Sequence, residues 1–258
     1  MKETVLTLWD DPDSTKIRFY PAEQKRGNGT VVIFAGGGYH VRAPYEEIDY
    51  ALRLNEYGLS VFTVDYRVAP DRFPLPLLDA RRAVRFVRKN AERFGIDPHK
   101  VAVMGSSAGG HLAALVSTYR GPIEGEGVDE VDKFDYLPDA AILCYPVITL
   151  SESHRHKWSA FNLLGERVNE LAAALSPDQI ADEKTPRTFL WHTANDELVP
   201  VKNSIRFVER LTSLGVPVEY HIFPDGRHGL GLAKENPYVA FWTELLRRWL
   251  IANEWLEK

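Results

Sequence analysis

Short apolar runs alternate with longer helical patterns along most of this chain. Six runs rich in β-branched or apolar residues predict buried strands, at Val31–Ala35, Leu59–Val64, Val101–Met104, Ala140–Tyr145, Thr188–Thr193 and Val218–Phe223. Apolar residues at helical spacing predict helices at Pro76–Phe94, Val201–Leu214 and Tyr238–Leu250. Gly95 is placed to end the first of these helices. Strands joined by helices are typical of a parallel sheet covered on both faces, so we expect an α/β fold.

Two regions depart from this alternation. The opening segments Thr4–Trp9 and Lys16–Tyr20 are more polar and alternate in character, which predicts an antiparallel pair at the sheet edge. The long stretch between the fourth and fifth apolar runs predicts only short helices, near Ala160–Leu164 and Arg167–Leu175. An insertion there would lie over the strand ends, where ligands bind in such folds. We therefore expect residues 1–258 to form one domain with a small cap at about 147–186.

Composition narrows the class of protein. A chain of 258 residues can bury a sizeable core without a metal or disulfide staple. The net charge of −5, with no basic stripe, gives no reason to expect a nucleic-acid partner. The single cysteine, Cys144, excludes an internal disulfide and a cysteine-based zinc site. No apolar run is long enough to span a membrane and the first residues lack a secretory signal, so we expect a cytoplasmic protein.

A glycine–serine motif follows the predicted strand at Val101–Met104 and precedes a helical run at His111–Tyr119. The segment matches the pattern G-x-S-x-G in only one alignment, which places Ser107 at the centre. In this motif a tight strand-to-helix turn lifts the serine hydroxyl away from the backbone, and the following N–H lies at a helix N-terminus. We therefore predict Ser107 as a nucleophile and the Ala108 N–H as a donor to an oxyanion.

Three consecutive glycines, Gly36 to Gly38, directly follow the strand Val31–Ala35. Because glycines are costly to order, three in a row indicate a backbone that must approach something closely. This is the position of the HGGG-type oxyanion loop, with Ala35 where the histidine usually stands. No phosphate-binding glycine motif follows, so we predict that the Gly37 and Gly38 N–H groups join Ala108 in an oxyanion hole.

In proteins with this motif the serine is followed along the chain first by an acid and then by a histidine base. This chain offers candidates for both in that order. His228 lies after the last predicted strand, in a polar loop, and is the predicted base. Asp196 follows the preceding strand and would hold the imidazole in the right tautomer. Glu197 and then Asp225 are the alternative acids.

These motifs together resemble the α/β-hydrolase superfamily, and within it small esterases such as acetyl esterases and acetylxylan-esterase-like enzymes. The resemblance covers nearly the whole chain and rests on GGGY at Gly36–Tyr39, YR-x-AP at Tyr66–Pro70, G-x-SAGGHLA at Gly105–Ala113 and T-x-x-D-x-x-VP at Thr193–Pro200. It implies an eight-stranded, mostly parallel sheet, no cofactor, and hydrolysis through an acyl-serine intermediate. It also implies a catalytic triad of Ser107, Asp196 and His228.

The resemblance leads us to expect a serine carboxylic-ester hydrolase that acts on small-molecule esters with short acyl groups, above all acetate. Acetylated xylo-oligosaccharides are among its expected substrates. Two alternatives stay open: an amidase of the kynurenine-formamidase type, and a non-catalytic ligand-binding member of the fold. A shared fold does not by itself fix the substrate.

Four side chains are candidates for a substrate pocket. Tyr39 and His40 flank the glycine loop, and Trp158 and Phe161 lie in the predicted cap. Each offers a ring that could pack against an acyl or sugar group.

Two further features are expected to have no catalytic role. His154 and His156 have the spacing of a ligand pair, but no third ligand stands at a telling distance, so no metal is expected. The basic run from Arg81 to Arg93 is predicted to form the solvent-exposed face of its helix.

Overall fold

In the part of the chain that the computed structural model describes, residues 3–11, 13–151 and 153–257, eight strands form one sheet in the order β1-β2-β4-β3-β5-β6-β7-β8. The strands are β1 Thr4–Thr7, β2 Lys16–Tyr20, β3 Thr30–Phe34, β4 Ser60–Val64, β5 Val101–Ser106, β6 Ala140–Cys144, β7 Arg187–Thr193 and β8 Val218–Phe223. Strands β3 to β8 run parallel, whereas β2 pairs antiparallel with both β1 and β4. The predicted mostly parallel sheet with an antiparallel edge pair is confirmed.

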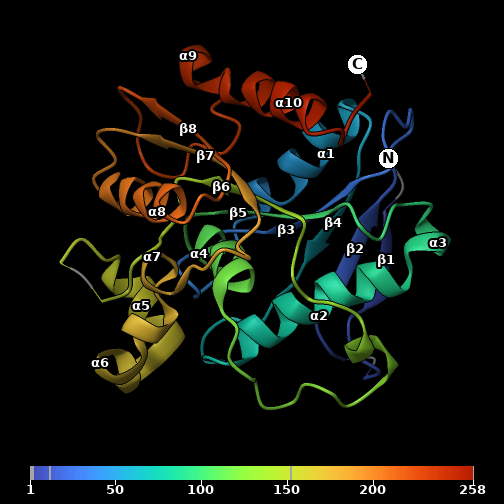
Figure 1. Cartoon of the computed structure of the whole chain (residues 1–258), viewed down its shortest axis with the longest axis horizontal. Coiled ribbons are helices and arrows are strands. Elements are labelled where there is room, and N and C mark those ends of the chain that lie inside the picture. Colours follow the sequence, from blue (N-terminus) through green and yellow to red (C-terminus); the bar gives the residue numbers. More distant parts are fainter. Residues whose placement is uncertain (1–2, 12, 152, 258) are drawn as a thin grey trace.

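Helices cover both faces of this sheet (Figure 1). One face carries α1 Ile48–Glu56, α9 Pro237–Ala240 and α10 Trp242–Ala252, and the other carries α2 Leu75–Lys89, α3 Ala91–Phe94, α4 Ser107–Thr118 and α8 Lys202–Ser213. Because successive strand residues point to opposite faces, β3 supplies Val31 and Ile33 to one core and Val32 and Phe34 to the other. None of the helices in the described ranges is long and apolar enough to cross a membrane.

Short helices fill the segment between β6 and β7, as predicted. They are α5 Lys157–Leu164, η3 Gly165–Arg167, α6 Val168–Leu171, η4 Ala173–Leu175 and α7 Pro177–Ile180. The segment packs onto the α4 side of the sheet, since Leu163, Leu164 and Leu175 are buried in the same apolar cluster as the helix α4 residue Leu112. In Figure 1, α5 and α6 project at one end of the molecule.

Three helices differ from their predictions, and one of them, predicted at Tyr238–Leu250, is interrupted at Phe241, which separates α9 from α10. Helix α1 has no predicted counterpart, because its start carries no capping side chain and its buried face includes the polar Asn55. The predicted helix at Pro76–Phe94 is interrupted at Asn90, which separates α2 from α3. It ends at Gly95, whose φ of 62° is the left-handed conformation typical of a helix C-terminus, as predicted.

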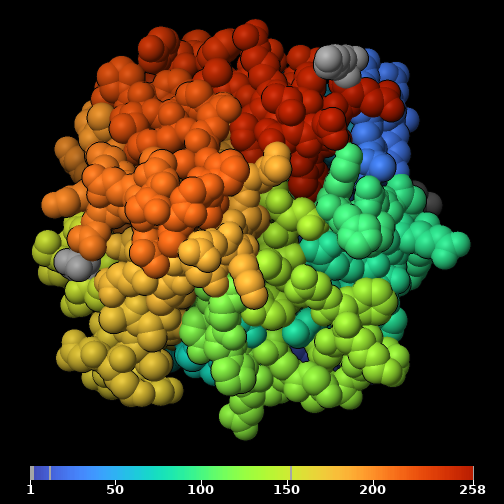
Figure 2. Space-filling model, viewed as in Figure 1, coloured from blue at the N-terminus to red at the C-terminus, as the bar shows by residue number. Residues whose placement is uncertain are grey.

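The basic face of α2 is buried, which corrects the prediction of a solvent-exposed face. Arg81 and Arg82 are only 1% and 2% exposed. Arg81 Nη1 lies 2.8 Å from Glu126 Oε2, and Arg82 Nη2 lies 2.5 Å from Asp129 Oδ2. Both acids lie in the segment between α4 and β6, which includes η2 Glu130–Lys133 and lies over the lower part of α2 in Figure 2. Partners 45 and 47 positions apart leave no local pattern in the sequence.

We expect Arg82→Ala to lower the free energy of unfolding by about 3 kcal/mol, because the buried Asp132 carboxylate loses one of its two arginine partners. Urea unfolding measures the change. Arg93→Ala, in an exposed residue of the same basic run, is the control and should stay within about 0.5 kcal/mol of the wild type. Equal midpoints for the two variants would show that the buried arginine contributes nothing to stability.

Candidate active site

Ser107 stands in a tight turn between β5 and α4. Its φ of 51° lies in the left-handed region, which is rare for residues other than glycine and common at functional sites. A Cβ atom on Gly105 would overlap the Gly109 carbonyl, and one on Gly109 would overlap the Phe34 carbonyl. The turn therefore has no room for side chains at either position, which is the physical reason for the G-x-S-x-G pattern.

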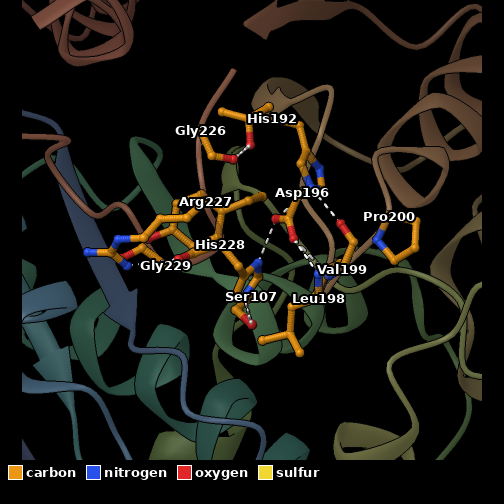
Figure 3. Close-up of polar contacts among 12 residues, drawn as sticks. Ser107, His192, Asp196, Leu198, Val199, Pro200, Gly226, Arg227, His228 and Gly229 are labelled. Atoms are coloured by element: carbon orange, nitrogen blue, oxygen red, sulfur yellow. Dashed lines mark hydrogen bonds and ion pairs between the residues drawn. The ribbon is translucent and has the colours of Figure 1, made fainter. Parts of the chain in front are cut away.

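The structure brings Ser107, His228 and Asp196 together (Figure 3). Ser107 Oγ lies 2.8 Å from His228 Nε2, and His228 Nδ1 lies 2.6 Å from Asp196 Oδ2. Ser107 follows β5, Asp196 follows β7 and His228 follows β8. Since these strands run parallel, all three side chains arise at the same edge of the sheet.

The Asp196 carboxylate is buried and accepts several hydrogen bonds. Its Oδ1 accepts the backbone N–H groups of Leu198 at 3.0 Å and Val199 at 2.9 Å, and its Oδ2 lies 3.3 Å from His192 Nε2. Burial acts to raise the pKa of Asp196, but the hydrogen bonds from His192 and His228 outweigh it and hold the pKa below the ordinary value. Asp196 is therefore ionised at neutral pH.

The alternative acids take no part in this arrangement. Among the carboxylates of the described residues, only that of Asp196 hydrogen-bonds to His228. Glu197 is exposed, and Asp225 is exposed and accepts a hydrogen bond from the Asn195 amide.

The glycine loop after β3 lies against the serine turn. A Cβ atom on Gly36 would come within 3.1 Å of Ser107 Cβ. Gly37 and Gly38 have φ values of 125° and 66° and line a cavity together with Ser107. Within the described part of the chain, the N–H groups of Gly37, Gly38 and Ala108 donate to no backbone carbonyl outside regular helices and strands. They remain available to an oxyanion.

A cavity of about 630 Å³ lies over Ser107. Its lining includes His40, Tyr45, Glu46, His156, Trp158, Asn162, Leu198 and His228. Trp158 is 68% exposed and Leu198 is 54% exposed, so the rim of the cavity presents apolar side chains to solvent. Of the four predicted pocket residues, His40 and Trp158 line this cavity.

Tyr39 and Phe161 lie outside the cavity lining, which corrects their prediction as pocket residues. Tyr39 has a φ of 58° and is fully buried, with its hydroxyl 2.7 Å from His111 Nδ1. The left-handed backbone at this position accompanies a ring that packs in the core. Phe161 packs instead beside Arg72, whose guanidinium carbon lies 5.5 Å from the centroid of the Phe161 ring.

Several cavity residues carry no motif that could have revealed them. Glu46, the last residue of η1 Pro44–Glu46, is 2% exposed and accepts the Gly36 N–H and the Tyr145 hydroxyl, each at 2.7 Å. Burial raises the pKa of Glu46 above its ordinary value, although both hydrogen bonds oppose the shift. Asn162 donates to the Gly38 carbonyl at 2.8 Å. Their roles depend on contacts between segments far apart in the chain.

His156, in the segment between β6 and β7, serves a local structure. His156 Nδ1 accepts the Ser159 N–H at 3.4 Å and so caps α5. In the ranges that the structure describes, no group of three or more histidine, cysteine, aspartate or glutamate side chains is arranged to hold a metal ion.

Residues 18–211 match the family model described as BD-FAE. An endo-1,4-beta-xylanase B of Butyrivibrio fibrisolvens is 33% identical over 218 residues, which cover 83% of this chain and 34% of that protein. An acetylxylan esterase of Xylanibacter ruminicola is 30% identical over 258 residues, which cover 96% of this chain and 50% of that protein. The chain thus spans between a third and a half of the length of these curated relatives.

Solved structures share the architecture over nearly the full chain. An acetyl ester-xyloside bifunctional hydrolase from Caldicellulosiruptor lactoaceticus is 40% identical with a TM-score of 0.92, covering 98% of this chain and 97% of that one. The esterase Est2 of Thermogutta terrifontis is 27% identical with a TM-score of 0.83, covering 98% and 93%. The chain has the α/β-hydrolase fold and belongs to the BD-FAE family.

Proposed function

We propose that this chain is a serine esterase that hydrolyses short acyl esters, with acetate as the acyl group. The observation that carries the proposal is the hydrogen-bonded line from Ser107 through His228 to Asp196 beside an open cavity. The choice of acetate is supported by the relatives named as an acetylxylan esterase and as an acetyl ester-xyloside hydrolase.

In the proposed reaction, Ser107 Oγ attacks the ester carbonyl while His228 Nε2 takes the hydroxyl proton. The backbone N–H groups of the glycine loop and of Ala108 receive the negative charge on the carbonyl oxygen. The ester C–O bond then breaks, and His228 gives its proton to the leaving alcohol. Water next attacks the acyl-serine with His228 as base, which releases the acid and restores Ser107. Asp196 orients the imidazole and stabilises its protonated form.

The open rim of the cavity supports a sugar as the alcohol half of the substrate. Trp158 presents an exposed indole in the same cavity as the nucleophile, and the apolar C–H face of a pyranose ring packs well on such a surface. His40, His156 and Asn162 place polar groups where sugar hydroxyls could bind. We therefore propose that acetylated xylo-oligosaccharides are better substrates than simple alkyl esters.

Ser107→Ala should lower kcat on p-nitrophenyl acetate by about a million-fold, because no other group replaces the nucleophile. Thermal unfolding of the variant controls for its fold. The wild-type enzyme is also assayed with N-formylkynurenine as substrate. Faster turnover of this amide than of the ester would favour the amidase alternative, and no turnover of either compound would favour the non-catalytic one.

Asp196→Asn should lower kcat by roughly 10⁴-fold, because asparagine keeps the shape of the site but holds His228 in the wrong tautomer. The matched control is Asp225→Asn, which alters an exposed acid close to the histidine in the chain and should keep activity within about twofold of the wild type. Steady-state kinetics on the same ester measures both. A large loss in the control variant and none in Asp196→Asn would reverse the assignment.

Trp158→Ala should lower kcat/KM on acetylated xylo-oligosaccharide by about tenfold, and should change p-nitrophenyl acetate hydrolysis less than about threefold. Tyr238→Ala is the control, because Tyr238 is 70% exposed but lies outside the cavity lining. Trp158→Phe should restore part of the loss. An equal loss on both substrates would mean that Trp158 shapes the cavity without binding the sugar.

A further inference from the structure

A second buried carboxylate, that of Glu46, lies near the proposed catalytic serine and histidine, and the reaction steps above do not use it. Glu46 lines the same cavity as Ser107 and His228. Its Oε2 accepts the N–H of Gly36, the first glycine of the oxyanion loop, and its Oε1 accepts the Tyr145 hydroxyl. A buried carboxylate is costly to desolvate, so its presence at this position calls for a physical role.

Tyr145 extends the contacts of Glu46 to the two other segments of the site. The Tyr145 hydroxyl accepts the Gly231 N–H at 2.9 Å, three residues beyond His228, and its ring packs edge-on against the His228 ring at 5.2 Å. The same hydroxyl lies 3.2 Å from that of Tyr50, which lies 2.8 Å from Ser106 Oγ. One network therefore joins the glycine loop, the residue before the nucleophile and the histidine loop.

We propose that Glu46 is a positioning residue for acyl transfer, which holds the glycine loop directly through Gly36 and holds the nucleophile and the base through Tyr145. The inference rests on the proposed esterase function. Its physical basis is that a displacement of about 1 Å among reacting groups can cost roughly a hundredfold in rate. Gly36 shows how close the packing is, since a Cβ atom there would lie 2.5 Å from Glu46 Oε2 and 2.9 Å from the Ser106 carbonyl oxygen.

Glu46 also acts on His228 through its charge. The side chains that face the His228 ring are those of Asp196, Ser107, Tyr145, His156 and Glu46. The Arg227 guanidinium donates to the backbone carbonyl of His228. Two donors point at the Glu46 oxygens, and together with nearby His228 they oppose the rise that burial causes in the pKa of Glu46. In its ionised form Glu46 adds its negative charge to that of Asp196 and favours the protonated imidazole that forms during the reaction.

Glu46→Gln and Tyr145→Phe test the two parts of this role. Glutamine keeps the size of the side chain and one acceptor oxygen but removes the charge, whereas phenylalanine removes the hydroxyl that links Glu46 to Gly231. The control is Asp178→Asn, which alters a buried carboxylate paired with Arg206 outside the cavity lining. For each variant, kcat and KM on p-nitrophenyl acetate are measured from pH 4 to 9, with thermal unfolding alongside.

We expect kcat to fall about tenfold or more in both site variants while KM stays within about threefold, because geometry in the transition state is lost and substrate binding is kept. The acidic limb of kcat/KM should move to lower pH in Glu46→Gln and should not move in Tyr145→Phe. Asp178→Asn should change thermal stability without changing kcat or the limb.

Values of kcat within twofold of the wild type in both site variants would overturn the positioning role, as would an equal loss in Asp178→Asn. An unmoved acidic limb in Glu46→Gln would overturn the effect of its charge on His228. An inactive wild type would instead refute the proposed function, so the two failures are distinguishable.

Discussion

The close approach of two backbone segments, the end of β3 with its glycine loop and the turn between β5 and α4, is the constraint on which the rest of the site depends. Gly109 lies against the carbonyl groups at the end of β3, and Gly36 lies against the serine turn, so neither position has room for a Cβ atom. Because β3 and β5 are parallel neighbours, this contact places the proposed oxyanion donors and the serine hydroxyl at one edge of the sheet. The same edge receives the loops after β7 and β8, which carry Asp196 and His228.

Two buried carboxylates flank the same histidine, and their surroundings act on them in opposite directions. Asp196 accepts two backbone N–H groups and faces two imidazoles, and this set of partners outweighs its burial and lowers its pKa. Glu46 has one backbone N–H and one phenol hydroxyl in the cavity wall, and burial dominates, which raises its pKa. The two carboxylates thus differ in their hydrogen-bond donors. Asp196 contacts His228 directly, whereas the contacts of Glu46 lie mainly with the surrounding loops.

The sequence predicts well what is decided within a few residues of a strand end. The serine turn and the glycine loop are local patterns, the acid and the histidine each follow a predicted strand, and the structure places all of them at one edge of the sheet. The errors concern side chains whose partners are remote: the α2 arginines bind acids beyond α4, and the Tyr39 hydroxyl reaches His111. Glu46 carries no signal for the same reason, since Tyr145 is 99 positions away.

The wide spacing of the site residues along the chain has a consequence for the order in which the site forms during folding. Ser107 and His228 are 121 positions apart, and Asp196 and His228 are 32 apart and lie on either side of β8. Contacts between distant positions form late, because closing a long loop costs entropy before it brings any stabilising contact. A folding intermediate with β3 to β6 paired would already hold the nucleophile turn but would lack both acid and base. The proposed set of catalytic side chains is therefore complete only once the last strand has joined the sheet.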